Sequence, residues 1–211
     1  GFQAFPSVKT VEEGISDDPQ DWNIFSYVME KHQRNDAANG KILYYLQQTY
    51  KYPYDFSSLV YASQLLQADG IRYGVEHFRR NRGQCMGAVY WQLNDCWPVT
   101  SWSSIDYYGR WKALHYYAKR FFAPVMISCE EQNWMTASAD MNHQHFAFEK
   151  SIRLNVANET KEEKHLTVKW ALRKADASVI REESQEITVA PLSACWLDKV
   201  LLPEADLFEE Y

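Results

Sequence analysis

The sequence lacks most of the local motifs that identify a catalytic or metal-binding protein. It has no glycine-rich phosphate loop, no HExxH pair, no GxSxG elbow and no CxxC spacing among its four cysteines. His143 and His145 form an HxH pair with no third ligand nearby in the sequence, so a solvated loop is favoured over a metal site. The sequence therefore predicts no metal ion and no other cofactor.

Concentrated positive charge is also missing. The 22 basic residues are spread along the chain and are outnumbered by 28 acidic residues, which gives a net charge of −6. Nucleic acid is therefore not an expected partner, because a phosphate backbone is bound by a dense cationic face. The one dense basic run, Arg79, Arg80 and Arg82, ends a helical pattern, where cations oppose the negative end of the helix dipole.

Membrane and export signals are absent from the given residues. No apolar run is long enough to cross a bilayer, so a membrane is not expected as a partner. The first residues contain neither Met nor the basic region of a signal peptide, so we expect a piece of a longer chain. Localisation stays open: periplasmic, secreted or lysosomal if the missing part carries a signal peptide, and cytoplasmic otherwise.

Residues 1–125 show helical periodicity around one short apolar run. The run from Cys85 to Trp91 is almost wholly apolar and is bounded by turn residues, which is typical of a parallel strand buried on both faces. The order helix, strand, loop, helix predicts an α/β fold. Helices are expected from Asp21, after Gly40, from Asp55 to Phe78, and from Gly109, the last with Trp111, Leu114, Ala118 and Phe121 facing inward.

Residues 126–211 show the period of strands instead. Apolar residues alternate with polar ones over 152–156, 166–172 and 187–189, which predicts an all-β sandwich. Short polar connectors at 158–160 and 175–178 are of the kind that join antiparallel strands. Asn158-Glu159-Thr160 also matches the glycosylation acceptor pattern, but a hairpin turn is the preferred interpretation.

The loop that follows the predicted strand is the candidate binding site. It offers Trp91, Asn94, Asp95 and Trp97, whose aromatic and polar groups suit a sugar ring and its hydroxyls. The chemistry of (β/α) barrels lies at the C-terminal ends of their strands, which is where this loop would lie. From the pattern alone, packing at a barrel rim, with Asp95 capping a turn, is the alternative.

Several strings in this region closely resemble the end of the catalytic barrel in the family 2 β-mannosidases. They are Tyr90-Trp91-Gln92-Leu93-Asn94-Asp95, residues 101–112 and His115-Tyr116. Residues 1–7 resemble the family segment that directly follows the nucleophilic glutamate on strand seven, and the β-rich part resembles the family's immunoglobulin-like domain. The resemblance implies a C-terminal fragment of a (β/α)8 TIM barrel over 1–125, followed by an immunoglobulin-like β-sandwich over 126–211.

The resemblance also implies a retaining glycoside hydrolase that removes terminal, non-reducing β-D-mannose residues. Its nucleophile and its acid/base glutamate would both lie N-terminal to Gly1, so the chain would contain no catalytic residue and be inactive alone. Trp91 would form the aromatic floor under the sugar, with Asn94 and Asp95 beside the site. Within this chain, Glu12 and Glu13 are the acidic pair that could replace the two missing catalytic glutamates, but they are expected in a solvated loop.

The expected partners are a β-mannoside or oligosaccharide substrate and the missing N-terminal part of the enzyme. An open sheet edge would seek that part or a second copy of the chain, so a homo-oligomer is also expected. A family 2 β-galactosidase or β-glucuronidase is the alternative within the class, although the Gln92–Asp95 loop favours mannosidases. A non-catalytic carbohydrate-binding or structural module is the alternative from another class.

Overall fold

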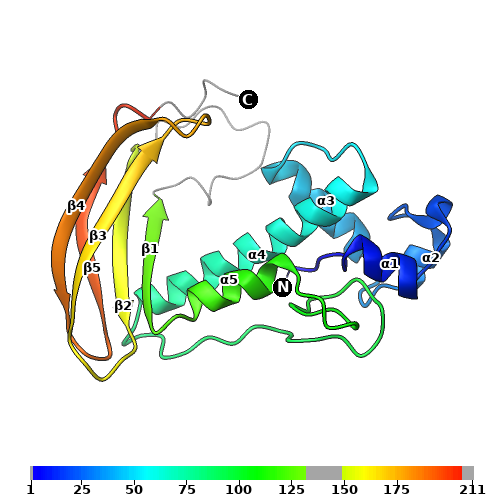
Figure 1. Cartoon of the computed structure of the whole chain (residues 1–211), viewed down its shortest axis with the longest axis horizontal. Coiled ribbons are helices and arrows are strands. Elements are labelled where there is room, and N and C mark those ends of the chain that lie inside the picture. The colour runs from blue at the N-terminus through cyan, green and yellow to red at the C-terminus, as the bar shows by residue number, and fades with distance from the viewer. Residues whose placement is uncertain (1, 132–148, 206–211) are drawn as a thin grey trace. The chain divides into compact units, whose positions relative to one another are not determined.

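The chain forms two compact units in a computed structural model that describes residues 2–131 and 149–205. One unit consists of residues 1–77 and 87–122, and the other of residues 78–86 and 123–211. The first is built from helices and loops and the second from antiparallel strands (Figure 1). The division of the chain into domains at residue 125 stays a prediction.

The helical unit packs around a core of large apolar side chains. Its central residues are Phe5, Val11, Met29, Ile42 and Leu46, all at most 3% exposed. The helix predicted after Asp55 is confirmed, the one predicted after Gly40 begins slightly earlier, at Ala38, and the one predicted from Gly109 begins only at Ala113. None of the described helices is long and apolar enough to cross a membrane. The elements are α1 (Val8–Gly14), the 3-10 helix η1 (Pro19–Asp21), α2 (Tyr27–Lys31), α3 (Ala38–Thr49), α4 (Phe56–Arg80) and α5 (Ala113–Phe121).

The helix predicted to start at Asp21 begins later in the chain. Asp21 ends the 3-10 helix, and α2 starts only after Ser26, whose hydroxyl oxygen accepts a hydrogen bond from the Met29 backbone N–H at 3.2 Å. The Ser26 hydroxyl also donates to the Asp21 carbonyl at 2.7 Å. The nearer serine therefore takes the N-cap position that the apolar spacing had assigned to the aspartate.

The parallel strand predicted over residues 85–91 is not formed in the described structure. Met86, Val89 and Trp91 are 68%, 98% and 72% exposed, where burial on both faces was expected. A central strand is buried only when neighbouring strands pair with both of its edges, and the described part of the helical unit contains isolated bridges instead of a sheet. Trp111 is also 51% exposed, so the prediction that it faces inward was wrong.

The second unit is a sandwich of two antiparallel sheets (Figure 1). One sheet has the order β1-β2-β5 and the other pairs β3 with β4. Leu154, Val156, Val168, Val189 and Leu197 meet between the sheets. The first four lie in the runs whose alternation predicted them to face inward, whereas Leu197 was not predicted. The strands are β1 (Val125–Glu131), β2 (Ser151–Asn158), β3 (Lys164–Arg173), β4 (Val179–Val189) and β5 (Ser193–Leu201).

The connection at residues 158–160 crosses from one sheet to the other, so the predicted hairpin is wrong there. The strand before it, β2, pairs with β1 and β5, whereas the strand after it, β3, pairs with β4. Asn158 is fully buried, and its amide donates to the carbonyls of Glu162 at 2.8 Å and Ala190 at 3.0 Å. The amide nitrogen that glycosylation would modify is therefore buried, and its hydrogen bonds stabilise the connection between the two sheets.

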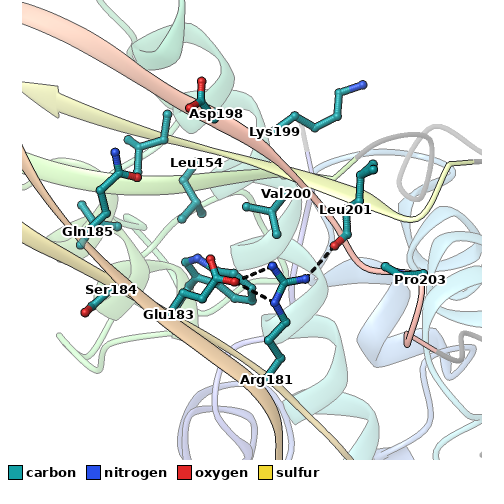
Figure 2. A pocket seen from close by; sticks show the side chains of 13 residues that line it. Leu154, Arg181, Glu183, Ser184, Gln185, Asp198, Lys199, Val200, Leu201 and Pro203 are labelled. Carbon is teal, nitrogen blue, oxygen red and sulfur yellow. Dashed lines mark hydrogen bonds and ion pairs between the residues drawn. The ribbon is translucent and has the colours of Figure 1, made fainter.

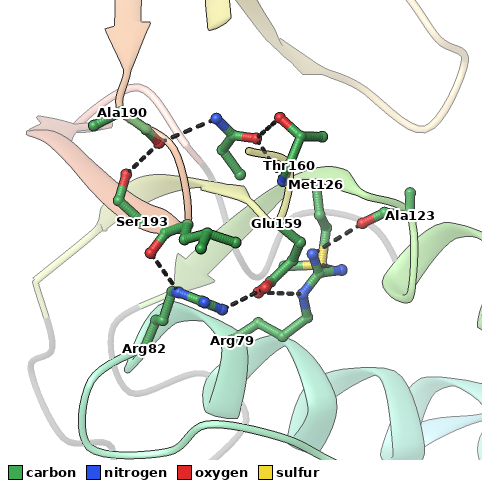
Figure 3. A network of polar contacts seen from close by, with 10 residues as sticks. Arg79, Arg82, Ala123, Met126, Glu159, Thr160, Ala190 and Ser193 are labelled. Atoms are coloured by element: carbon green, nitrogen blue, oxygen red, sulfur yellow. Dashed lines mark hydrogen bonds and ion pairs between the residues drawn. The ribbon is translucent and has the colours of Figure 1, made fainter. Parts of the chain in front are cut away.

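The basic run at the end of α4 belongs to the sandwich unit. Arg82 forms an ion pair with Glu159 and donates to the Leu192 carbonyl at 2.6 Å, while Arg79 donates to the Ala123 carbonyl at 2.9 Å (Figure 3). Arg79 also lies 3.9 Å from the Glu159 carboxylate. The helix does end at this run, as predicted, and the arginines attach that end to sandwich residues from three separate chain segments.

Candidate functional site

The candidate site is the tip of the loop that runs from Trp91 to Asp95 in the helical unit. Backbone hydrogen bonds join this tip to residues 102–105: Gln92 donates to the Trp102 carbonyl at 3.2 Å, and Ile105 donates to the Leu93 carbonyl at 2.9 Å. The Asp95 N–H donates in turn to the Ile105 carbonyl at 3.3 Å. The tip is therefore held by strand-like pairing although it is not part of a sheet.

The four predicted site residues lie in different environments. Trp91 and Asn94 are exposed, Trp97 is half-buried and packs against the His32 ring at 5.0 Å between centroids, and Asp95 is only 5% exposed. The structure therefore presents Trp91 and Asn94 to solvent and turns Asp95 inward. Trp97 belongs to a contact with the segment that follows α2.

Asp95 is a buried hydrogen-bond acceptor. Its carboxylate receives the hydroxyls of Ser101 at 2.7 Å and Ser103 at 2.6 Å, and the side-chain amide of Gln92 at 3.3 Å. The hydroxyl oxygens of Ser101 and Ser103 also lie 3.0 Å apart. A carboxylate with this many partners on its own loop fixes the shape of the loop, which agrees with a bracing role.

Lys112 lies fully buried beneath the same loop. Its ammonium donates to the carbonyls of Ala4 at 3.2 Å and Ser101 at 3.5 Å. Burial lowers the pKa of Lys112 to about 8, although the carboxylates of Asp95 and Asp106 act in the opposite direction. The lysine thereby connects the N-terminal segment to the loop by hydrogen bonds, and its charge is favoured by the two buried acids.

A second buried acid, Asp106, attaches the loop to α1. Its carboxylate accepts from the Thr10 hydroxyl and from the Arg110 backbone N–H, the latter at 2.9 Å. The Arg110 guanidinium forms an ion pair with Glu13, and this hydrogen bond lowers the pKa of Glu13. Glu12 and Glu13 lie on α1, so the prediction that they occupy a loop was wrong. Glu13 joins α1 to the loop through its ion pair with Arg110.

The two buried acids and Lys112 were not predicted as a network. Each lies in a run of polar and aromatic residues without a regular period, so periodicity gives no sign of their burial. The signal available is composition: Ser101, Ser103 and Ser104 lie between the two acids, and small hydroxyls are suited to donate to buried carboxylates.

The sandwich contains a groove of about 630 Å³ between its two sheets (Figure 2). The groove is lined by Trp170 from β3, by Arg181 and Glu183 from β4, and by β5. The Arg181 guanidinium lies 5.2 Å from the Trp170 ring centroid and donates to Glu183 and to the Leu201 carbonyl, each at 2.9 Å. This face of the Trp170 ring is therefore covered by the protein's own cation and offers no open platform to a sugar.

Metal ligands do not gather in the part of the chain that the structure describes. No three His, Cys, Asp or Glu side chains among residues 2–131 and 149–205 come together as a metal site would require. The His143 and His145 pair lies outside the described residues.

Sequence comparison finds β-mannosidases. The Mannosidase Ig/CBM-like domain family matches residues 150–209. The β-mannosidase of Capra hircus is 37% identical over 139 residues, which is 60% of this chain and 16% of that protein. The β-mannosidase B of Aspergillus terreus is 30% identical over 191 residues, which is 87% of this chain and 22% of that protein. The chain thus spans about a fifth of the length of these relatives.

Solved structures show the same likeness over the whole chain. The β-D-mannosidase from Dictyoglomus thermophilum superposes with a TM-score of 0.79 and 26% identity, covering 99% of this chain and 24% of that one. An exo-chitosanase from Amycolatopsis orientalis shares the fold at 19% identity, a TM-score of 0.70 and coverage of 94% of this chain and 22% of that one. Fold and sequence together define a part of a glycoside hydrolase. Within that class, the proteins that match this chain in both sequence and fold are β-mannosidases.

Proposed function

We propose that the protein to which this chain belongs removes terminal, non-reducing β-D-mannose residues with retention of configuration. Retention requires two carboxyl groups on opposite sides of the scissile bond, one as nucleophile and one as acid and then base. Both glutamates would precede Gly1, so this chain supplies the sugar-binding rim and not the reacting groups. The similarity to β-mannosidases of mammals and fungi supports this assignment.

In this proposal, residues 1–125 complete a (β/α)8 barrel and residues 126–211 form the immunoglobulin-like domain after it. The exposed apolar side chains of residues 85–91 support the first part, because a barrel strand finds its hydrogen-bonding neighbours in the preceding strands. The N-terminal part of the enzyme is then the necessary partner. A homo-oligomer is also predicted, because the same open edge could pair with a second copy of the chain.

One observation carries the assignment of the site. Ala4 and Ser101 exchange backbone hydrogen bonds at 3.0 and 3.3 Å, and Ser101 also holds Asp95. By the family resemblance, residues 1–7 directly follow the nucleophile. The loop that carries Trp91 is thus fastened to the segment that would position the nucleophile, as expected if both serve one sugar pocket.

The proposal is tested by assaying the whole gene product and the 211-residue chain on an aryl β-mannoside. We expect turnover by the whole protein and none by the chain, because the chain would lack both carboxylates. Aryl β-galactosides and β-glucuronides measured in parallel separate the related family 2 activities. Equal turnover by both polypeptides would refute the placement of the catalytic groups, and turnover by neither would refute the activity.

Trp91→Ala in the whole protein tests the sugar-binding role of the loop. We expect kcat/KM on the aryl β-mannoside to fall about tenfold or more, because the mannose ring would lose the aromatic side chain on which it stacks. Trp91→Phe should recover part of the loss. Leu93→Ala is a matched control, since Leu93 is 56% exposed on the same tip and contributes its backbone to the pairing. Unchanged kinetics in Trp91→Ala would remove this residue from the site.

A further inference from the structure

Besides the groove in the sandwich, a groove is present in the helical unit, and it is formed by residues outside the predicted site. It has a volume of about 350 Å³ and lies between the residues after η1 and the residues before α4. Three of its rings are strongly exposed: Phe25 at 60%, Tyr52 at 81% and Tyr54 at 91%. Five of its lining residues are aromatic: Trp22, Phe25, Tyr52, Tyr54 and Phe56.

The floor of this aromatic groove is fixed by the core. The rings of Trp22 and Phe56 stack at 6.2 Å between centroids with an interplanar angle of 28°, and Phe56 packs against the buried Phe5 at 6.3 Å. The Trp22 indole donates to the Ser16 carbonyl at 3.0 Å. A rigid floor of this kind binds a ligand without first having to order its own side chains.

Polar groups lie beside the rings. Asn23 is exposed, and its side-chain oxygen accepts from the Phe25 N–H at 3.0 Å, which leaves the amide nitrogen as a donor. Asp55 accepts from the Ser58 N–H at 2.6 Å and keeps further acceptor positions on its carboxylate. The groove therefore combines aromatic faces with a neutral donor and a charged acceptor.

This combination matches a sugar better than an apolar protein segment. A pyranose ring has an apolar face of C–H bonds and an edge of hydroxyls that both donate and accept, so it can stack on a ring and bind an amide and a carboxylate at once. The aliphatic side chains at the groove, Ile24 and Leu59, are buried or half-buried, so the apolar surface that the groove exposes most strongly is aromatic.

The segment that follows α2, with the first turn of α3, contacts both the groove and the predicted sugar loop. The Asn39 amide donates to the carbonyl of the groove residue Ile24 and accepts from the Gln33 side chain, each at 2.7 Å. The neighbouring His32 ring packs against Trp97 at 5.0 Å between centroids, and the His32 carbonyl accepts from the Thr100 N–H at 2.8 Å. We propose that the groove binds a sugar residue on the leaving-group side of an oligosaccharide substrate. This inference rests on the proposed function, and it assigns the enzyme a preference for oligosaccharides over short mannosides.

The test compares an aryl β-mannoside with β-1,4-linked mannopentaose in the whole gene product. For the double variant Tyr52→Ala/Tyr54→Ala we expect kcat/KM on mannopentaose to fall about tenfold, because two stacking faces are lost. On the aryl mannoside it should stay within about twofold, because that substrate does not reach the groove. Tyr61→Ala is the control, since Tyr61 is 65% exposed on α4 and does not line the groove.

Equal losses on both substrates, or no loss on either, would overturn the inference. If the unmodified protein hydrolyses neither substrate, the proposed function is wrong, and direct titration with mannopentaose, followed by tryptophan fluorescence, then decides on the groove. Binding that weakens about tenfold in the double variant supports the groove as a sugar site. Equal binding by both proteins, or no binding, overturns it.

Discussion

Replacing Asp95 with alanine is expected to lower the free energy of unfolding by about 2–4 kcal/mol, because each buried donor that loses its acceptor costs about 1–3 kcal/mol. The substitution takes the acceptor away from the hydroxyls of Ser101 and Ser103 and leaves the buried Lys112 with one fewer carboxylate nearby. Urea unfolding of the gene product, followed by tryptophan fluorescence, measures the change.

Asn94→Ala is the matched control for this variant. Asn94 is exposed, and its amide donates to the Asp95 carbonyl at a long 3.3 Å, so its removal should change stability by no more than about 0.5 kcal/mol. If Asp95→Ala retained its stability and lost activity instead, Asp95 would be a substrate contact. The bracing role would then be wrong.

The stability of the protein is expected to rise with pH between about 8 and 10.5 through Lys112. In the unfolded chain the pKa of Lys112 is the ordinary 10.5, whereas burial lowers it to about 8 in the folded protein. Between these values the unfolded chain binds more protons, so the free energy of unfolding increases with pH. The 2.5-unit difference corresponds to about 3 kcal/mol. The neutral amine keeps two N–H donors for the carbonyls of Ala4 and Ser101.

Lys112→Met isolates this contribution. The free energy of unfolding of the unmodified protein, minus that of the variant, should grow by about 3 kcal/mol from pH 7 to pH 10.5, because all other titrating groups are shared. Lys119→Met removes an exposed lysine from α5 and should leave the pH dependence unchanged. Parallel pH profiles for Lys112→Met and the unmodified protein would show that the buried lysine does not titrate in this range.

Periodicity was sufficient to predict the elements whose burial follows a regular spacing. In α3, Ile42 and Leu46 are one helical turn apart and both buried. Leu154 and Val156 in β2 and Val168 in β3 are also buried in the core, as predicted, whereas Ile152 and Leu172 are not part of the core cluster. The start of α2 could not be predicted from spacing, because one hydrogen bond, donated by the Met29 N–H to the Ser26 hydroxyl oxygen, decides it. The sheet crossing after β2 depends on which strands pair, which a local pattern does not record.

The candidate site was predictable only in part, for a related reason. An apolar tryptophan at a loop tip and a charged aspartate next to it suggest one binding surface, yet Trp91 is exposed and Asp95 is buried. The inward orientation of Asp95 follows from partners further along the chain, such as Ser101 and Ser103, which lie six and eight positions away. Composition identified the loop, and only the contacts separate the residue that faces a ligand from the residue that supports it.

The α4 helix has a consequence for any attempt to isolate the sandwich. Its last turn, with Arg79, and Arg82 just beyond the helix belong to the same compact unit as the strands, and 77 positions separate Arg82 from Glu159. A polypeptide that begins at residue 126 would omit both guanidinium groups and strip Glu159 of its counter-ions. The complete sandwich unit therefore cannot be expressed as one continuous segment that starts at its first strand, because residues well before that strand supply part of its ion pairs and hydrogen bonds.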